Sequence, residues 1–117
     1  MTIEWFDAKN VALDILIKVA AAGKLITYRD LCNKLRRAKA IDMHHRSPKL
    51  CLFLDEMNQH ELLEGRPLIS AVVVHQGNKK PGNGFEALCR RLKQNPDHAF
   101  QRGRAYEYWR NHPWSAK

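Results

Sequence analysis

Two helix-start signals in the first half of the chain limit the folds that it can adopt. Thr27 is followed three residues later by Asp30, a capping pair in which the hydroxyl accepts a backbone hydrogen bond and the carboxylate reaches back. Ser47 is followed by Pro48, and proline is favoured in the first helical position because no partner for its missing N–H is needed there. The expected helices cover about 28–36 and 48–60.

A strand and a glycine-rich loop follow these two predicted helices. Residues 68–74 form an unbroken apolar run rich in branched side chains, which predicts a strand buried on both faces. Residues 77–84 combine glycine, asparagine and proline with two lysines, a composition typical of a turn. A first small strand is expected at 24–26. Helix, helix, strand and loop in this order predict an α+β fold, a small winged-helix-like domain that is mostly helical with a short β-sheet.

The length of 117 residues corresponds to one domain with a single modest core. We therefore treat 1–117 as one winged-helix-like domain, with a core at about 7–93 and a C-terminal helical extension at about 94–117. Apolar side chains at helical spacing predict three further helices. These are 8–22, with Asp7 as N-cap and Gly23 as its stop, then 85–93 and 97–111.

The charge of the chain is basic and arranged in blocks. The formal net charge is +8, which favours an anionic partner, most plausibly nucleic acid. Residues 24–49 hold eight basic side chains against two acidic ones, and 77–104 hold seven against two. Between them, 50–64 hold four acidic side chains and no lysine or arginine. Two basic segments that met on one face would form a surface able to follow phosphates.

The second predicted helix has a basic start and an acidic far end. Arg46 and Lys49 lie at its start, where a helix-turn-helix protein places side chains against base edges and phosphates. The four acidic residues of 50–64 are expected to point away from DNA. The predicted DNA-binding residues on the two helices and the loop are Tyr28, Arg29, Arg36, Arg37, His45, Arg46, Lys49, Lys79 and Lys80.

The cysteines and the hydropathy exclude several classes of protein. Cys32, Cys51 and Cys89 are widely spaced, so neither a disulfide framework nor a Cys-x-x-Cys metal site is expected, and the predicted location is the reducing cytoplasm. No stretch approaches the ~20 apolar residues of a membrane span. The glycine-rich loop lacks the Gly-x-x-x-x-Gly-Lys-Ser/Thr order of a phosphate-binding loop, so no nucleotide site is expected. The expected function uses no cofactor and no metal.

The order of the motifs resembles a known family. Thr-Tyr-x-x-Leu at 27–31, a basic second helix, an apolar run after Arg66-Pro67 and a glycine-rich loop are similar to the winged-helix domain of O6-alkylguanine-DNA alkyltransferases and alkyltransferase-like proteins. The resemblance covers about 25–85 and implies binding to double-stranded DNA. In that family an arginine of the recognition helix takes the place of a flipped nucleotide, and Arg46 is the nearest candidate here.

The chain departs from that family at the reactive position. Where the family has Pro-Cys-His-Arg or a substituted version after the strand, residues 70–74 read Ser-Ala-Val-Val-Val. The three cysteines lie elsewhere, and no histidine is spaced to activate them. The sequence therefore predicts a non-enzymatic DNA-binding protein, similar to small domains that accompany bacterial or phage nucleases and defence systems.

Two alternatives from other classes stay open. Six histidines in 117 residues are compatible with a small histidine- or metal-dependent nuclease or toxin, with Asp42 and Asp55 as nearby carboxylates. The basic surface is also compatible with an inhibitor or adaptor that binds an acidic protein partner. Divalent metal ions would reveal the first by DNA cleavage, and indifference to DNA would favour the second.

Overall fold

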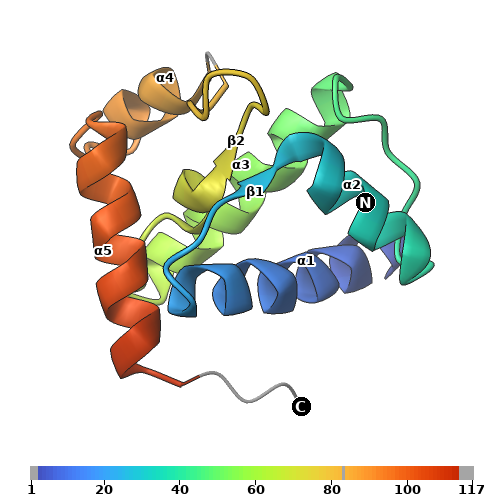
Figure 1. The fold of residues 1–117 in the computed structure, drawn as a ribbon, viewed down its shortest axis with the longest axis horizontal. Helices are drawn as coiled ribbons and strands as arrows, with labels where there is room; N and C mark the ends of the chain where they lie inside the picture. The colour runs from blue at the N-terminus through green and yellow to red at the C-terminus, as the bar shows by residue number, and fades with distance from the viewer. Residues whose placement is uncertain (1–2, 83, 114–117) are drawn as a thin grey trace.

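The longest helix, α1 (Ile3–Ala21), is in contact with most of the other elements. The computed structural model describes residues 3–82 and 84–113, and in it α1 packs against α2, α3, α5 and the 3-10 helix η1 (Figure 1). The fold is α+β. The remaining elements are β1 (Ile26–Thr27), α2 (Tyr28–Arg37), α3 (Pro48–Leu63), η1 (Ile69–Val72), β2 (Val73–Val74), α4 (Gly84–Arg91) and α5 (His98–Asn111).

The expected end of α1 is confirmed, but its expected start is wrong. Gly23 adopts a φ of 67°, and its N–H donates to the carbonyl of Ala20 at 2.9 Å while Lys24 donates to Val19 at 3.1 Å. This pair of bonds is the usual glycine-terminated helix end. Asp7 is not an N-cap, because the helix already runs from Ile3 and Asp7 lies within it.

The predicted side-chain caps of Thr27 and Ser47 are confirmed. Thr27 Oγ1 accepts a hydrogen bond from the backbone N–H of Asp30 at 3.0 Å at the start of α2. Ser47 Oγ accepts from the N–H of Lys49 at 3.2 Å, with Pro48 in the first turn of α3. Both helices extend beyond the predicted ends, to 37 and 63.

The predicted strand over 68–74 is correct in its burial and wrong in its conformation. All seven residues are buried, but η1 occupies 69–72 and only Val73 and Val74 form a strand. β2 pairs in parallel with β1, with Ile26 opposite Val73 and Thr27 opposite Val74. A short, fully buried apolar run fits a turn of helix as well as a strand, and periodicity alone does not separate the two.

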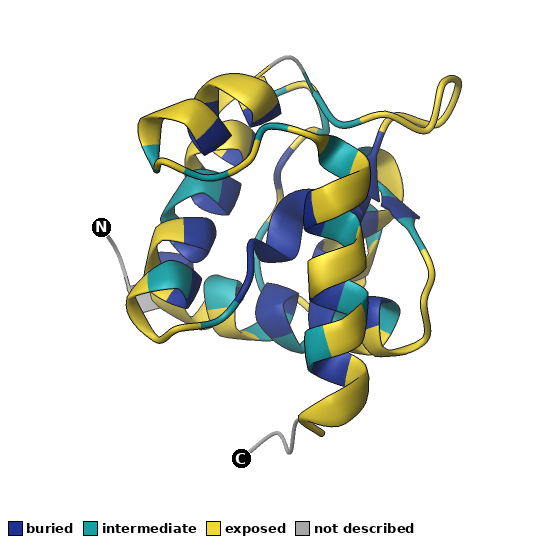
Figure 2. Ribbon diagram, turned by 90° about the vertical axis from the view of Figure 1, so that its left-hand side faces the viewer, coloured by how far each residue is buried: buried dark blue, intermediate teal, exposed yellow. Residues whose placement is uncertain are grey.

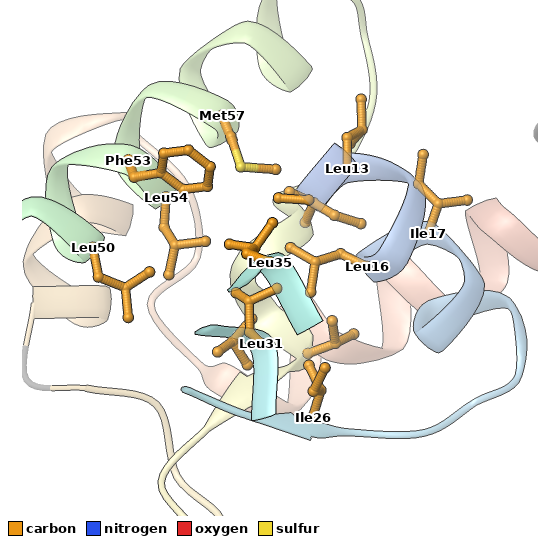
Figure 3. Packing of buried hydrophobic residues seen from close by; sticks show 14 of the residues in the cluster. Leu13, Leu16, Ile17, Ile26, Leu31, Leu35, Leu50, Phe53, Leu54 and Met57 are labelled. Carbon is orange, nitrogen blue, oxygen red and sulfur yellow. The ribbon is translucent and has the colours of Figure 1, made fainter. Parts of the chain in front are cut away.

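The main core lies between α1, α2 and α3 and reaches α5. Leu16, Leu31, Leu35 and Phe53 are fully buried there (Figure 3). Figure 2 shows buried residues on the inner sides of the helices and exposed residues on their outer sides. Trp109 places α5 in the same cluster, and a smaller cluster joins α4 to η1. Within the part of the chain that is described, no helix has both the length and the apolarity needed to cross a membrane.

Carboxylates of α3 take part in the packing of the fold. Glu61 is only 1% exposed, and both of its oxygens accept hydrogen bonds from Arg66, at 2.6 Å and 3.1 Å. These hydrogen bonds raise the pKa of the Arg66 guanidinium. Asp55 faces Arg91 of α4 at 3.4 Å, and Glu56 accepts from Lys9 of α1 at 2.9 Å. The acidic segment therefore contributes ion pairs between elements of the fold as well as surface charge.

A buried polar pair fixes η1 against α3. Asn58 is fully buried; its Nδ2 donates to Ser70 Oγ at 2.6 Å, and its Oδ1 accepts from the backbone N–H of Ser70 at 3.1 Å. Removing the amide leaves two buried groups of Ser70 without this partner, and each such loss costs about 1–3 kcal/mol.

We expect Asn58→Ala to lower the free energy of unfolding by about 2–4 kcal/mol, measured by urea denaturation. Asn10→Ala, which removes an exposed amide of α1, serves as the control and should change the midpoint little. A loss smaller than about 0.5 kcal/mol at Asn58 would contradict the assigned role of the pair.

Candidate nucleic-acid interface

A hollow lies where the starts of two helices meet the loop after β2. Its volume is about 730 Å³, within the ~300–1,000 Å³ typical of ligand pockets. The first turns of α2 and α3 and the first residue of α4 contribute to its wall, together with the loop 75–82. The wall includes Tyr28, Arg29, His45, Arg46, Cys51, His75 and Gly82.

The parallel pairing of the two strands brings these segments together. Because Thr27 lies opposite Val74, the next residues along the two chains, Tyr28 and His75, leave the sheet side by side. Their rings are 4.9 Å apart between centroids. Parallel strands end at the same edge of a sheet, the usual place for a binding crevice in open parallel sheets. The start of α2, which follows β1, and the loop 75–82, which follows β2, therefore lie at the same edge of the sheet.

Tyr28 ties the loop to the start of α2. Its hydroxyl accepts a hydrogen bond from the backbone N–H of Gly82 at 2.7 Å. A Cβ at Gly82 would lie 3.2 Å from the same oxygen, so a larger residue would press on the tyrosine. Burial raises the pKa of Tyr28, and the hydrogen bond from Gly82 acts in the opposite direction. The phenol is thus a neutral part of the wall.

Three cationic or titratable side chains of the predicted set line the pocket. Arg29 projects from the first turn of α2, and His45 and Arg46 precede α3. The rings of His44 and His45 stack at 4.3 Å. Partial desolvation, followed by the charges of His44, Arg29 and Arg46, lowers the pKa of His45. The N-terminal ends of the helices add their own positive potential to this side of the molecule.

The predicted loop lysines and the α2 arginines are not part of the pocket wall. Lys79 and Lys80 are exposed on the loop, which is closed by a hydrogen bond from the N–H of His75 to the carbonyl of Lys80 at 2.7 Å. Arg36 and Arg37 stand at the opposite end of α2, roughly 12 Å along the helix axis from Tyr28.

One of the two α2 arginines is also paired with a carboxylate. Arg36 Nε lies 3.2 Å from Asp42. Lys49 is exposed in the first turn of α3, beside the pocket. The structure therefore brings Tyr28, Arg29, His45 and Arg46 together at the pocket. The three lysines lie outside its wall, in segments that contribute other residues to it, and the two arginines lie at the far end of α2.

Two pocket residues were missed by sequence reasoning. Cys51 is exposed and lines the pocket, whereas Cys32 and Cys89 are buried, and burial raises the pKa of both buried thiols. Cys51 lies one turn after Ser47, so helical spacing could have placed it on the same face. His75 lies at the pocket because β2 pairs with β1 in a particular register, and no local sequence signal indicates that register.

Residues 70–74, the segment that the sequence comparison set against the Pro-Cys-His-Arg motif, are buried. Ser70 belongs to η1, is 6% exposed and is bound to Asn58. The carboxylates considered for a metal site, Asp42 and Asp55, face Arg36 and Arg91. Within residues 3–82 and 84–113, no three His, Cys, Asp or Glu side chains are grouped closely enough to hold a metal ion.

We compared the chain with models of protein families, with curated proteins and with solved structures. None of the three comparisons finds a match.

Proposed function

We propose that this protein binds double-stranded DNA at the pocket face and carries out no reaction on it. The observation that supports this most is the meeting of Arg29, His45 and Arg46 with the lysine-bearing loop around one hollow. With the loop, three separate chain segments supply basic side chains on this side of the protein, and contacts of this kind to backbone phosphates fix the orientation of a protein on a duplex. The net charge of +8 supports an anionic partner of extended form.

The proposed docking follows the winged-helix arrangement. The start of α3, with Arg46 and Lys49, faces a groove of the duplex. The loop 75–82 takes the place of the wing, and Lys79 and Lys80 contact backbone phosphates beside it. Arg36 and Arg37 are distant from the pocket, so in this proposal they make at most a weak, long-range contribution that salt screens.

The pocket itself has room for one unpaired base. Its wall includes the aromatic ring of Tyr28 and the ring of His75, which offer stacking faces, and arginines stand at its edge. A base already unpaired costs less to insert than a paired one, because the unstacking and unpairing energy is reduced. We therefore propose that a duplex with one unpaired base binds more tightly than a fully paired duplex.

The absence of a reaction is part of the proposal. Ser70 stands in the segment where the alkyltransferase motif has its nucleophile, and its hydroxyl is held by Asn58 in the core. We also propose a cytoplasmic location, since the three cysteines are free and a reducing compartment keeps them so.

We expect Arg29→Ala and Arg46→Ala each to weaken binding to a short duplex about three- to tenfold and to lower the salt slope of log K by about one. The physical reason is the loss of one phosphate contact in each variant. Fluorescence anisotropy at several salt concentrations measures both quantities. Arg110→Ala, which removes an equal charge from the exposed end of α5, is the matched control.

Equal effects of all three arginine variants would contradict the assignment of DNA binding to the pocket face, because affinity would then depend only on net charge. The same titrations, repeated with Mg²⁺ or Mn²⁺ and followed by gel analysis of the DNA, test the nuclease alternative. Cleavage of the DNA in the presence of metal would show that the protein is a nuclease and would contradict the proposal of binding without reaction. Tight binding to polyglutamate with indifference to DNA would favour an acidic protein partner.

We expect DNA affinity to rise as the pH falls from about 7.5 to about 5.5, the range in which histidine titrates. In the free protein the pKa of His45 is lowered, so the neutral form prevails near neutral pH. A nearby phosphate raises that pKa, so binding takes up a proton, and affinity gains up to about tenfold per unit of pKa difference between bound and free protein. Anisotropy at constant ionic strength measures this.

His45→Gln should remove most of the pH dependence while keeping a hydrogen-bonding side chain. His112→Gln, at the exposed end of α5, is the control and should leave the dependence unchanged. A flat affinity in the wild type, or an unchanged slope in His45→Gln, would show that His45 is not near a phosphate.

The exposed Cys51 offers a direct test of the pocket. We expect a duplex with one unpaired base, present at about ten times its Kd, to slow alkylation of Cys51 by N-ethylmaleimide about tenfold, as followed by mass spectrometry. Cys32 and Cys89 are buried and should react slowly throughout. The fully paired duplex should protect Cys51 less at the same concentration. Undiminished alkylation of the DNA-bound protein would place the DNA elsewhere.

A further inference from the structure

A second hollow, an apolar groove, runs between α1 and α3. Its volume is about 190 Å³, and Phe6, Leu13 and Met57 supply apolar surface in its wall. Lys9, Glu56 and His60 stand along it. Lys9 binds Glu56 at 2.9 Å, and its ammonium lies over the Phe6 ring, 4.7 Å from the ring centre. The lysine therefore covers part of one face of the ring, and Phe6 stays 53% exposed.

The two helices of this groove carry exposed apolar side chains, one of them, Phe6, in the groove wall. Phe6, Leu52 and Leu63 are 53%, 49% and 86% exposed, and they are three of the four large apolar side chains exposed in the described part of the chain. Leu52, Glu56 and Leu63 follow the four- and seven-residue spacing that aligns side chains along one face of α3. Exposed apolar surface on the helices of a groove is a mark of an interaction site.

The two helices that form the groove carry a charge opposite to that of the whole protein. α1 and α3 with its cap residue Glu64 contain seven carboxylates against three lysines, a net of −4 in a chain of +8. The carboxylates in the groove wall itself, Glu56 and Glu61, are paired with Lys9 and Arg66. The exposed carboxylates are Glu4 and Asp7, near Phe6 in α1, and Glu64, which follows Leu63. Exposed carboxylates repel DNA and attract lysine and arginine side chains.

We propose that the α1–α3 groove binds an amphipathic helix of a partner protein, with apolar residues on one face and basic residues flanking them. Apolar anchors at helical spacing fit an elongated groove between two helices. The carboxylates around it select basic flanks by charge complementarity. This goes beyond the proposed DNA binding and does not depend on it.

The groove and the pocket use different sides of α3. Cys51, in the pocket wall, and Glu56, in the groove wall, are five residues apart, which corresponds to about 140° around a helix of 3.6 residues per turn. A partner helix in the groove therefore leaves the pocket free. The protein could hold DNA on one side and the partner on the other.

A displayed library of helical peptides, selected on the full chain, tests this proposal. We expect the enriched peptides to carry apolar residues at i, i+3 or i+4, and i+7, with a net positive charge. The best peptide is then synthesised and titrated by anisotropy. Phe6→Glu and Leu63→Glu should each weaken it about tenfold or more.

Phe100→Glu is the control for this test, since Phe100 is a 48% exposed apolar residue of α5 outside the groove wall. It should leave peptide affinity unchanged, and all three variants should still bind DNA if the pocket face does so. No enrichment, enrichment of acidic peptides, or peptides indifferent to Phe6→Glu and Leu63→Glu would overturn the proposal. Self-association of the wild type that Leu63→Glu abolishes, seen by sedimentation, would assign the groove to a second copy instead.

Discussion

The parallel pairing of β1 with β2 is the interaction on which the geometry of the pocket depends. Each strand has only two residues, far fewer than an isolated sheet needs to be stable. Burial supplies the missing stability, since Ile26 and Val73 are 6% and 0% exposed and belong to the main core. A shift of one residue in this register would separate Tyr28 from His75 and remove the wall that they form. The candidate site is thus a consequence of the core.

α3 links that site to the rest of the molecule because its two ends face different surroundings. Its start, capped by Ser47, opens into the basic pocket. Farther along, Glu56 is tied to α1, and Glu61 is tied to Arg66 after the helix. The first basic segment therefore ends at the start of α3, and the acidic segment occupies its remaining turns. This separation lets the proposed DNA face and the proposed partner groove carry opposite charge without cancelling each other.

Local chemistry explains which parts of the fold could be predicted. Caps at Thr27 and Ser47 and the stop at Gly23 act within one turn of a helix, so their sequence signals were sufficient. The conformation of 68–74 was not predictable in this way, because burial on all sides removes the alternation that distinguishes a strand. There the choice depends on Asn58, twelve residues away, which holds the Ser70 backbone in η1.

Only those residues of the candidate site that lie next to a helix start marked in the sequence could be predicted. Arg46 and His45 lie beside a helix start that the sequence marks, but the distance of Arg36 from them follows from the length of α2, and its pairing with Asp42 follows from the turn of the chain after that helix. A count of basic residues does not distinguish those at the pocket from those distant from it. A basic side chain belongs to the pocket only if it lies where separate chain segments meet, and the strand register determines that place. Composition therefore indicated an anionic partner, while the packing of two short strands determines which few cations can meet it together.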